Sequence, residues 1–139
     1  MEQKNKANTG FNIDKILLVE CSFSRAVNVS FDKDVENKVD VDVEVGEVNS
    51  ATISVKETVI IEQTKGNTVQ FSLKVTMIGV FQKVGETQID MEKFGHINAA
   101  AIIFPFIREQ IASLALKAGL GVILLPPVNF EERWKSNSK

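Results

Sequence analysis

Residue types that perform chemistry are scarce in this sequence of 139 residues. It contains one cysteine, one histidine, one tryptophan and no tyrosine. A single cysteine, Cys21, cannot form an intramolecular disulfide, so we expect a reducing compartment such as the cytoplasm. A structural zinc site needs four cysteine or histidine ligands, which is more than the chain has. Cys21 and His96 are the only candidate pair for nucleophilic catalysis, and nothing local in the sequence brings them together. We therefore predict no enzyme, no metal site and no cofactor.

Clusters of positive charge and long apolar runs are also missing. The 16 basic residues are offset by 18 acidic ones, for a net charge of −2. Binding to phosphates needs clustered basic residues, so we predict no nucleic-acid partner. The opening residues, MEQKNKANTG, lack the apolar run and cleavage site of a signal peptide. The longest uncharged runs, 97–107 and 118–130, are shorter than the roughly 20 apolar residues of a membrane-spanning helix. These patterns predict a soluble, cytoplasmic protein that does not insert into a membrane.

Alternating apolar and polar residues predict strands in the first two thirds of the chain. We expect a disordered lead-in over residues 1–12, one domain over 13–135 and a tail over 136–139. The expected strands cover residues 13–31, 39–45, 51–61 and 69–83. In the second of these, the acidic residues face water, and a solvated strand face is a simpler interpretation than a calcium site. They are Asp40, Asp42 and Glu44.

Three residues or short segments interrupt these strand patterns. Glu57 breaks the apolar alternation of the third expected strand. Lys65-Gly66-Asn67 is typical of a hairpin turn. Gly79 predicts a bulge or bend in the fourth strand.

One very apolar helix is predicted over residues 97–117. Pro105 is expected to kink this helix or to mark the start of its regular part. Gly119 and Gly121 end it, and the prolines at 126–127 prevent it from resuming. A short second helix is expected over residues 130–135. The fold class is therefore α+β: a four-stranded antiparallel sheet followed by a long apolar helix and a short C-terminal helix.

The long helix has two apolar sides, which need two packing partners. One side would cover the sheet, and the other most simply contacts a second subunit. The residues predicted at the subunit interface are Ile103, Ile107, Ile111 and Leu114. Arg108 and Glu109 form either a solvated edge of the helix or a charged pair that orders it at that interface. The aromatic residues are either core or the lining of a groove for apolar peptides. The residues predicted for such a groove are Phe81, Phe94, Phe104, Phe130 and Trp134.

Two motifs, FPFIRE at 104–109 and LLPPVNF at 124–130, resemble the paired signature of the SecB protein-export chaperone family. ILLVECSF at 16–23 and FSLKVTMIGVF at 71–81 resemble the family's first and last strands more loosely. The resemblance implies a four-stranded antiparallel sheet with a long helix, and a homotetramer built as a dimer of dimers. It also implies an ATP-independent holdase, which keeps unfolded precursor proteins competent for translocation and passes them to the SecA export motor.

The sequence departs from the family where members contact SecA. They present acidic residues on the outer face of the sheet and carry an acidic C-terminal tail. Glu20 matches one acidic position, but Ser24 and Lys74 occupy the other two, and the chain ends in KSNSK. Three alternatives therefore stay open: a SecB-like chaperone of another system, such as one that guards antitoxins, a small-ligand-binding oligomeric protein, and a purely structural oligomer subunit.

Overall fold

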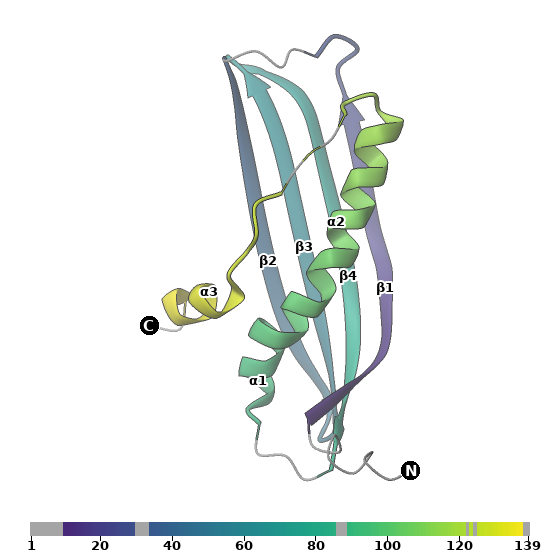
Figure 1. The fold of residues 1–139 in the computed structure, drawn as a ribbon, viewed down its shortest axis with the longest axis vertical. Helices are drawn as coiled ribbons and strands as arrows, with labels where there is room; N and C mark the ends of the chain where they lie inside the picture. Colours follow the sequence, from purple (N-terminus) through teal and green to yellow (C-terminus); the bar gives the residue numbers. More distant parts are fainter. Residues whose placement is uncertain (1–9, 30–33, 86–88, 122, 124, 138–139) are drawn as a thin grey trace.

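Four long antiparallel strands form one sheet in the computed structural model (Figure 1), which describes residues 10–29, 34–85, 89–121, 123 and 125–137. The strands are β1 (Gly10–Arg25), β2 (Val35–Asn49), β3 (Thr52–Lys65) and β4 (Thr68–Val84). Their order in the sheet is β1-β4-β3-β2, so β1 and β2 are the edge strands. This arrangement confirms the α+β class.

The helices all lie on one face of the sheet. A short helix α1 (Met91–Phe94), a π-helical turn η2 (Gly95–Ala99) and the long helix α2 (Ala100–Lys117) follow one another and cross that face diagonally (Figure 1). The chain then returns across the sheet to α3 (Phe130–Asn137), which lies beside β2. None of the described helices covers the opposite face, which we call the outer face.

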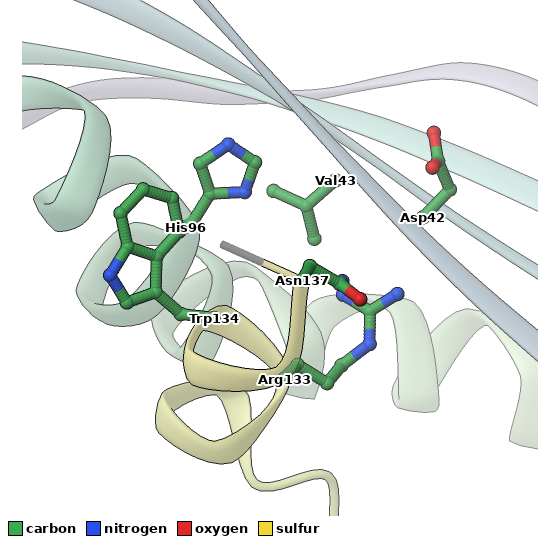
Figure 2. Close-up of a pocket in the computed structure, with 6 residues that line it drawn as sticks. All are labelled: Asp42, Val43, His96, Arg133, Trp134 and Asn137. Carbon is green, nitrogen blue, oxygen red and sulfur yellow. The ribbon is translucent and has the colours of Figure 1, made fainter. Parts of the chain in front are cut away.

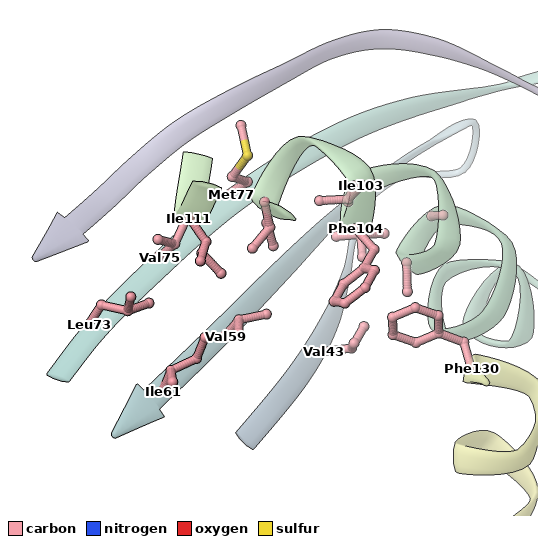
Figure 3. Packing of buried hydrophobic residues seen from close by; sticks show 14 of the residues in the cluster. Val43, Val59, Ile61, Leu73, Val75, Met77, Ile103, Phe104, Ile111 and Phe130 are labelled. Carbon is pink, nitrogen blue, oxygen red and sulfur yellow. The ribbon is translucent and has the colours of Figure 1, made fainter. Parts of the chain in front are cut away.

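The core lies between α2 and the two central strands. Alternate residues of a strand point to opposite faces, so the odd-numbered residues of β3 and β4 face the helix. Figure 3 shows how these side chains meet those of α2 and α3. The fully buried apolar residues include Ile53, Val55, Val59, Val75, Phe81, Ile103, Ile107 and Ile111.

Several element boundaries differ from those predicted. β1 begins at Gly10, so residues 10–12 belong to the sheet and not to a lead-in, while residues 1–9 lie outside the described part. β1 also ends at Arg25, well before the predicted residue 31. α3 continues to Asn137, which places residues 136–137 in a helix and leaves 138–139 outside the described residues. Short-range alternation predicted the strands but not how far pairing with neighbours extends them.

Gly79 has a different role from the predicted bulge. It pairs with Ile16 of β1 and Val55 of β3 with no register shift at that position. A Cβ atom at residue 79 would lie 2.8 Å from the Phe81 ring and 2.9 Å from Ile103. The glycine is therefore needed because α2 approaches the sheet closely there.

The continuous helical stretch formed by α1, η2 and α2 starts at Met91, earlier than the predicted residue 97, although α2 itself starts at Ala100. Asp90 caps α1 by accepting a hydrogen bond from the Glu92 amide at 3.0 Å. Such a carboxylate cap satisfies an amide that has no partner within the helix. Pro105 lies inside α2 and so does not mark the start of its regular part. The hairpin predicted at 65–67 is confirmed, with Gly66 at φ +62° between β3 and β4.

The predicted stop of α2 is confirmed. The amide of Leu120 donates to the Ala115 carbonyl at 2.9 Å, and Gly119 adopts φ +72°. This is a Schellman cap, in which glycine takes the left-handed conformation at little cost. Arg25, at the end of β1, also donates to the carbonyl of Ala118. The end of the helix is thereby tied to the end of an edge strand.

The helical stretch Met91–Lys117 is long and apolar enough to cross a membrane, by length and composition alone. It is longer than the uncharged runs predicted, because α1 and η2 extend it. In the structure, one side of it is buried against the sheet. The buried residues are Gly95, Ala99, Ala100, Ile103, Phe104, Ile107, Ile111 and Ala115. This packing is that of a core helix.

Glu57 does not interrupt the alternation of β3; it continues it on the helix-facing side. Its side chain is fully buried, and neither carboxyl oxygen has a hydrogen-bond partner among the described residues. It lies between Val43 of β2 and Met77 of β4, its paired neighbours in the sheet. Burial raises the pKa of Glu57 from 4.5 to about 8, and the positive charge of Arg133 partly opposes this rise. An acid therefore occupies a core position where an apolar residue would pack at lower cost.

We expect Glu57→Leu to raise the free energy of unfolding at neutral pH by about 1–3 kcal/mol, the usual cost of an unsatisfied buried polar group. Because the pKa of Glu57 is higher in the folded chain, its proton stabilises the folded state. The contribution is complete below the ordinary glutamate pKa and is lost as the pH rises to about 8. Urea unfolding from pH 5 to 9 checks both points. A wild-type and variant pair with equal stability and parallel pH profiles would contradict this account.

Candidate functional site

An open, mostly apolar groove lies between the start of the long helix and the segment that leads into α3. It has a volume of about 510 Å³. Ile97 of η2 and Ala101 of α2 form one wall, and residues 127–131 form the other. An open, mostly apolar groove of this size is a candidate binding site.

The end of the LLPPVNF motif, residues 127–130, forms most of the second wall of the groove. Pro126 and Pro127 lack backbone amide donors and keep the segment extended. Asn129 then starts α3, because its side-chain oxygen accepts a hydrogen bond from the Glu132 amide at 3.0 Å. Phe130 is buried and packs edge-on against Phe104, with ring centroids 5.7 Å apart (Figure 3). The motif thus places an extended apolar segment and a capped helix beside α2.

Only some of the aromatic residues predicted for the groove are available to a ligand. Phe81 and Phe104 are buried in the core, with 0% and 5% of their surfaces exposed, which corrects that prediction for both. Phe94 is half-buried and stacks on Phe11, with ring centroids 3.9 Å apart. Phe130 lines the groove, but it is only 4% exposed and so offers a ligand no more surface than Phe104 does. Sequence reasoning named the aromatics but missed the groove's smaller residues, Ile97 and Ala101, since neither stands out from its apolar neighbours.

Trp134 lines a second, smaller pocket of about 200 Å³ between α3 and β2. Its ring stacks on His96 with centroids 5.0 Å apart, and Figure 2 shows the two rings side by side. Arg133 donates a hydrogen bond from Nη2 to the Val41 carbonyl at 2.5 Å. These contacts dock α3 on η2, through the Trp134–His96 stack, and tie it to the edge strand β2 through Arg133.

The predicted subunit-interface residues need correction. Ile103, Ile107 and Ile111 are fully buried against the chain's own sheet. They are therefore unavailable to a partner, and Leu114 is half-buried beside the same core. On the other side of α2, Phe106 and Leu116 are 49% and 68% exposed. The two apolar sides were identified from the sequence, but their periodicity gives no information on which one meets the sheet.

The acidic residues lie on the outer face of the sheet. Asp40, Asp42 and Glu44 alternate with residues that face the helix and are exposed, as predicted. Glu20 is exposed as well, and its carboxylate lies 3.3 Å from the ammonium group of Lys74. Glu20, the acid predicted for docking on SecA, thus forms an ion pair with Lys74, which occupies a position where the family has an acid.

The structure does not bring Cys21 and His96 together as a catalytic pair. Cys21 is exposed on β1 and receives a contact from Gln110 at 3.5 Å. His96 lies 3.3 Å from Glu92 on the same helical stretch. Within the described residues, no group of three or more potential ligands is arranged to hold a metal ion.

Comparison with known proteins identifies the family. Residues 3–139 match the SecB family, described as preprotein translocase subunit SecB. A protein-export protein SecB from Halorhodospira halophila is 31% identical over 96% of this chain and 81% of the relative. Another from Saccharophagus degradans is 29% identical over 92% of this chain and 79% of the relative.

A solved structure has the same fold. It is a SecB-like chaperone from Mycobacterium tuberculosis in complex with a ChAD peptide from an antitoxin. The TM-score is 0.74 over 86% of this chain and 91% of that one, at 13% sequence identity. The family resemblance indicated by the FPFIRE and LLPPVNF motifs is therefore confirmed, because the family match covers residues 3–139. This chain belongs to the SecB family.

Proposed function

We propose that this protein is an ATP-independent chaperone that holds non-native polypeptides in a state competent for export. Its membership of the SecB family supports this function, as do the relatives named for protein export. The observation that carries the proposal is the open apolar groove at Ile97, Ala101 and residues 127–131. An unfolded chain exposes apolar side chains, and this groove offers them a surface without demanding a particular sequence. A cytoplasmic location fits a holdase that acts before export.

The energy available in one groove is modest. Burying one large apolar side chain contributes about 1.5–3 kcal/mol. Two such side chains give at most about 6 kcal/mol, which is weaker than micromolar binding. Holding a long client therefore requires several grooves acting together, as in a multivalent assembly.

We propose that the chain assembles as a homotetramer, a dimer of dimers. β1 is an edge strand of 16 residues with several half-exposed apolar side chains, and such an edge favours pairing with another chain. They are Ile13, Leu17, Leu18 and Val19. The exposed side of α2, with Phe106 and Leu116, supplies a second apolar surface. Two surfaces on different elements are what a dimer of dimers needs.

Handoff to the SecA motor is proposed through the outer face around Glu20. The exposed ion pair with Lys74 reduces the negative charge that Glu20 presents. Export is favoured over the antitoxin-guarding alternative because relatives named for export are about 30% identical over most of the chain. The structure bound to an antitoxin peptide is similar in fold alone.

The groove is tested by placing a charge in it. Ala101 is exposed and lines the groove, so Ala101→Asp should weaken client binding about tenfold or more, because a carboxylate there disfavours burial of apolar side chains. The control is Ala51→Asp, the same change at an exposed turn between β2 and β3. Suppression of aggregation of an unfolded test protein, and anisotropy of a labelled apolar peptide, measure the effect. Equal activity of the two variants would contradict the assignment of the groove.

Assembly is tested on the exposed side of α2. Phe106→Asp should lower the mass measured by light scattering at micromolar concentration, because it puts an unpaired charge into the proposed apolar interface. The fold should persist, since Phe106 is exposed in the single chain. Val27→Asp, at a residue 88% exposed, is the control and should leave the mass unchanged. A Phe106→Asp protein with the wild-type mass would exclude this surface.

Motor docking is tested by restoring an acid to the outer face. Lys74→Glu removes the partner of Glu20 and adds a negative charge, so we expect tighter and more salt-sensitive SecA binding by calorimetry. Lys93→Glu makes the same charge change on α1 and should have no such effect. The docking proposal fails if both variants bind SecA as the wild type does.

A further inference from the structure

Arg133 connects α3 both to the backbone of β2 and to the buried acid of β3. Its guanidinium donates to the Val41 carbonyl, on an edge strand. Its charge also lowers the pKa of Glu57, although burial raises that pKa by more. One side chain of α3 thus interacts with both the edge of the sheet and the carboxyl group in the core.

Glu57 is the sheet neighbour of a residue that lines the pocket between α3 and β2. Val43, which pairs with Glu57 in the β2–β3 register, lines this pocket of about 200 Å³ together with Arg133 and Trp134 (Figure 2). With α3 docked, Glu57 has no exposed surface. Movement of α3 away from β2 would open this pocket and bring water close to the carboxyl group.

Few other charged groups face Glu57. From α3 the charged group is Arg133, and from η2 it is His96, which is paired with Glu92 of α1. On β2, Asp42 and Glu44 flank Val43; both are exposed, and Asp42 also lines the pocket beside Arg133. The buried residues that α2 and β4 contribute nearby are uncharged: Ile103, Phe104, Ile107, Val75 and Met77. The ionisation of Glu57 is therefore governed mainly by its burial and by Arg133.

We propose that Glu57 and Arg133 form a proton-controlled latch that positions α3: protonated Glu57 favours α3 docked on β2, and ionised Glu57 favours α3 released from it. Phe130, the first residue of α3, lines the groove, so release of α3 moves one wall of the groove. Only the effect of the latch on client binding rests on the proposed function. The docking of α3 does not depend on that function and can be measured without a client.

The direction follows from linkage between ionisation and hydration. A carboxylate is more stable in water than in the core, so conformations that hydrate Glu57 lower its pKa. Between the ordinary glutamate pKa and about 8, each pH unit shifts the balance towards release by up to about tenfold. The attraction of Arg133 opposes release, but the net rise of the pKa shows that burial is the larger effect.

The only tryptophan of the chain, Trp134, lies on α3 and reports its docking. We would titrate Trp134 fluorescence and its quenching by acrylamide from pH 5 to 9.5 in the full chain. The expected result is a transition that ends near pH 8, with stronger quenching at high pH. Glu57→Gln, which keeps the shape of the side chain but cannot ionise, should lack this transition. Because His96 stacks on Trp134, the same titration is repeated in His96→Asn proteins with and without Glu57→Gln as the control.

A second variant tests the role of Arg133 with Glu57 intact. Arg133→Met removes the charge that lowers the pKa of Glu57 and the hydrogen bond to Val41. Release of α3 should then be easier at every pH, so the transition midpoint should move to lower pH and quenching should be stronger throughout the transition. The proposal is overturned if the wild type shows no transition between pH 6 and 9, if Glu57→Gln retains it, or if Arg133→Met leaves its midpoint unchanged.

Aggregation suppression at fixed pH separates the latch from the proposed function. A protein that shows the Trp134 transition but holds no unfolded client would contradict the chaperone proposal and support the latch. A protein that holds clients without the transition would contradict the latch alone.

Discussion

The packing of α2 on the central strands determines the rest of the structure. The helix buries one side against the odd-numbered residues of β3 and β4. Two glycines allow the helical stretch to come close, Gly79 of β4 under α2 and Gly95 of η2 over β2. A Cβ atom at Gly95 would lie 2.5 Å from Val45, and one at Gly79 would meet Ile103 at 2.9 Å. Interiors pack at crystal-like density, so these contacts fix both the height and the direction of the helix over the sheet.

The position of the groove follows from the course of this helix. The cap at Gly119 ends α2 beside the end of β1, where Arg25 binds the last turn. The chain must then return over the sheet, and the prolines at 126–127 keep the returning segment extended until Asn129 starts α3. The apolar groove is the space left between the beginning of the helix and the end of this return. An apolar groove thus arises from the positions at which helices stop and start.

The strands and helices were predictable because their signals are local. Alternation marked β2, β3 and β4, and the glycines marked the end of α2. The misplaced features depend on contacts between distant residues. Periodicity revealed two apolar sides of α2, but only tertiary packing decides that Ile107 faces the sheet and Phe106 faces outward.

Glu57 is a second feature that local sequence patterns could not place. An acid within an apolar alternation is a clear signal, and it predicts an interruption of that alternation within the strand. The strand continues, and the acid is buried because its neighbours in β2 and β4 are held at fixed register. The pKa of Glu57 also depends on Arg133 of α3, which is 76 positions away in the sequence. No local pattern relates these two residues.

The most direct test of client holding is methyl NMR of the assembled protein with an unfolded polypeptide added. The account predicts shifts and broadening at Ile97, Ala101 and Val128, which line the groove, and little change at Val59 and Val75 in the core. Perturbation confined to outer-face residues such as Ile60 and Ile78, with the groove methyls unchanged, would contradict it.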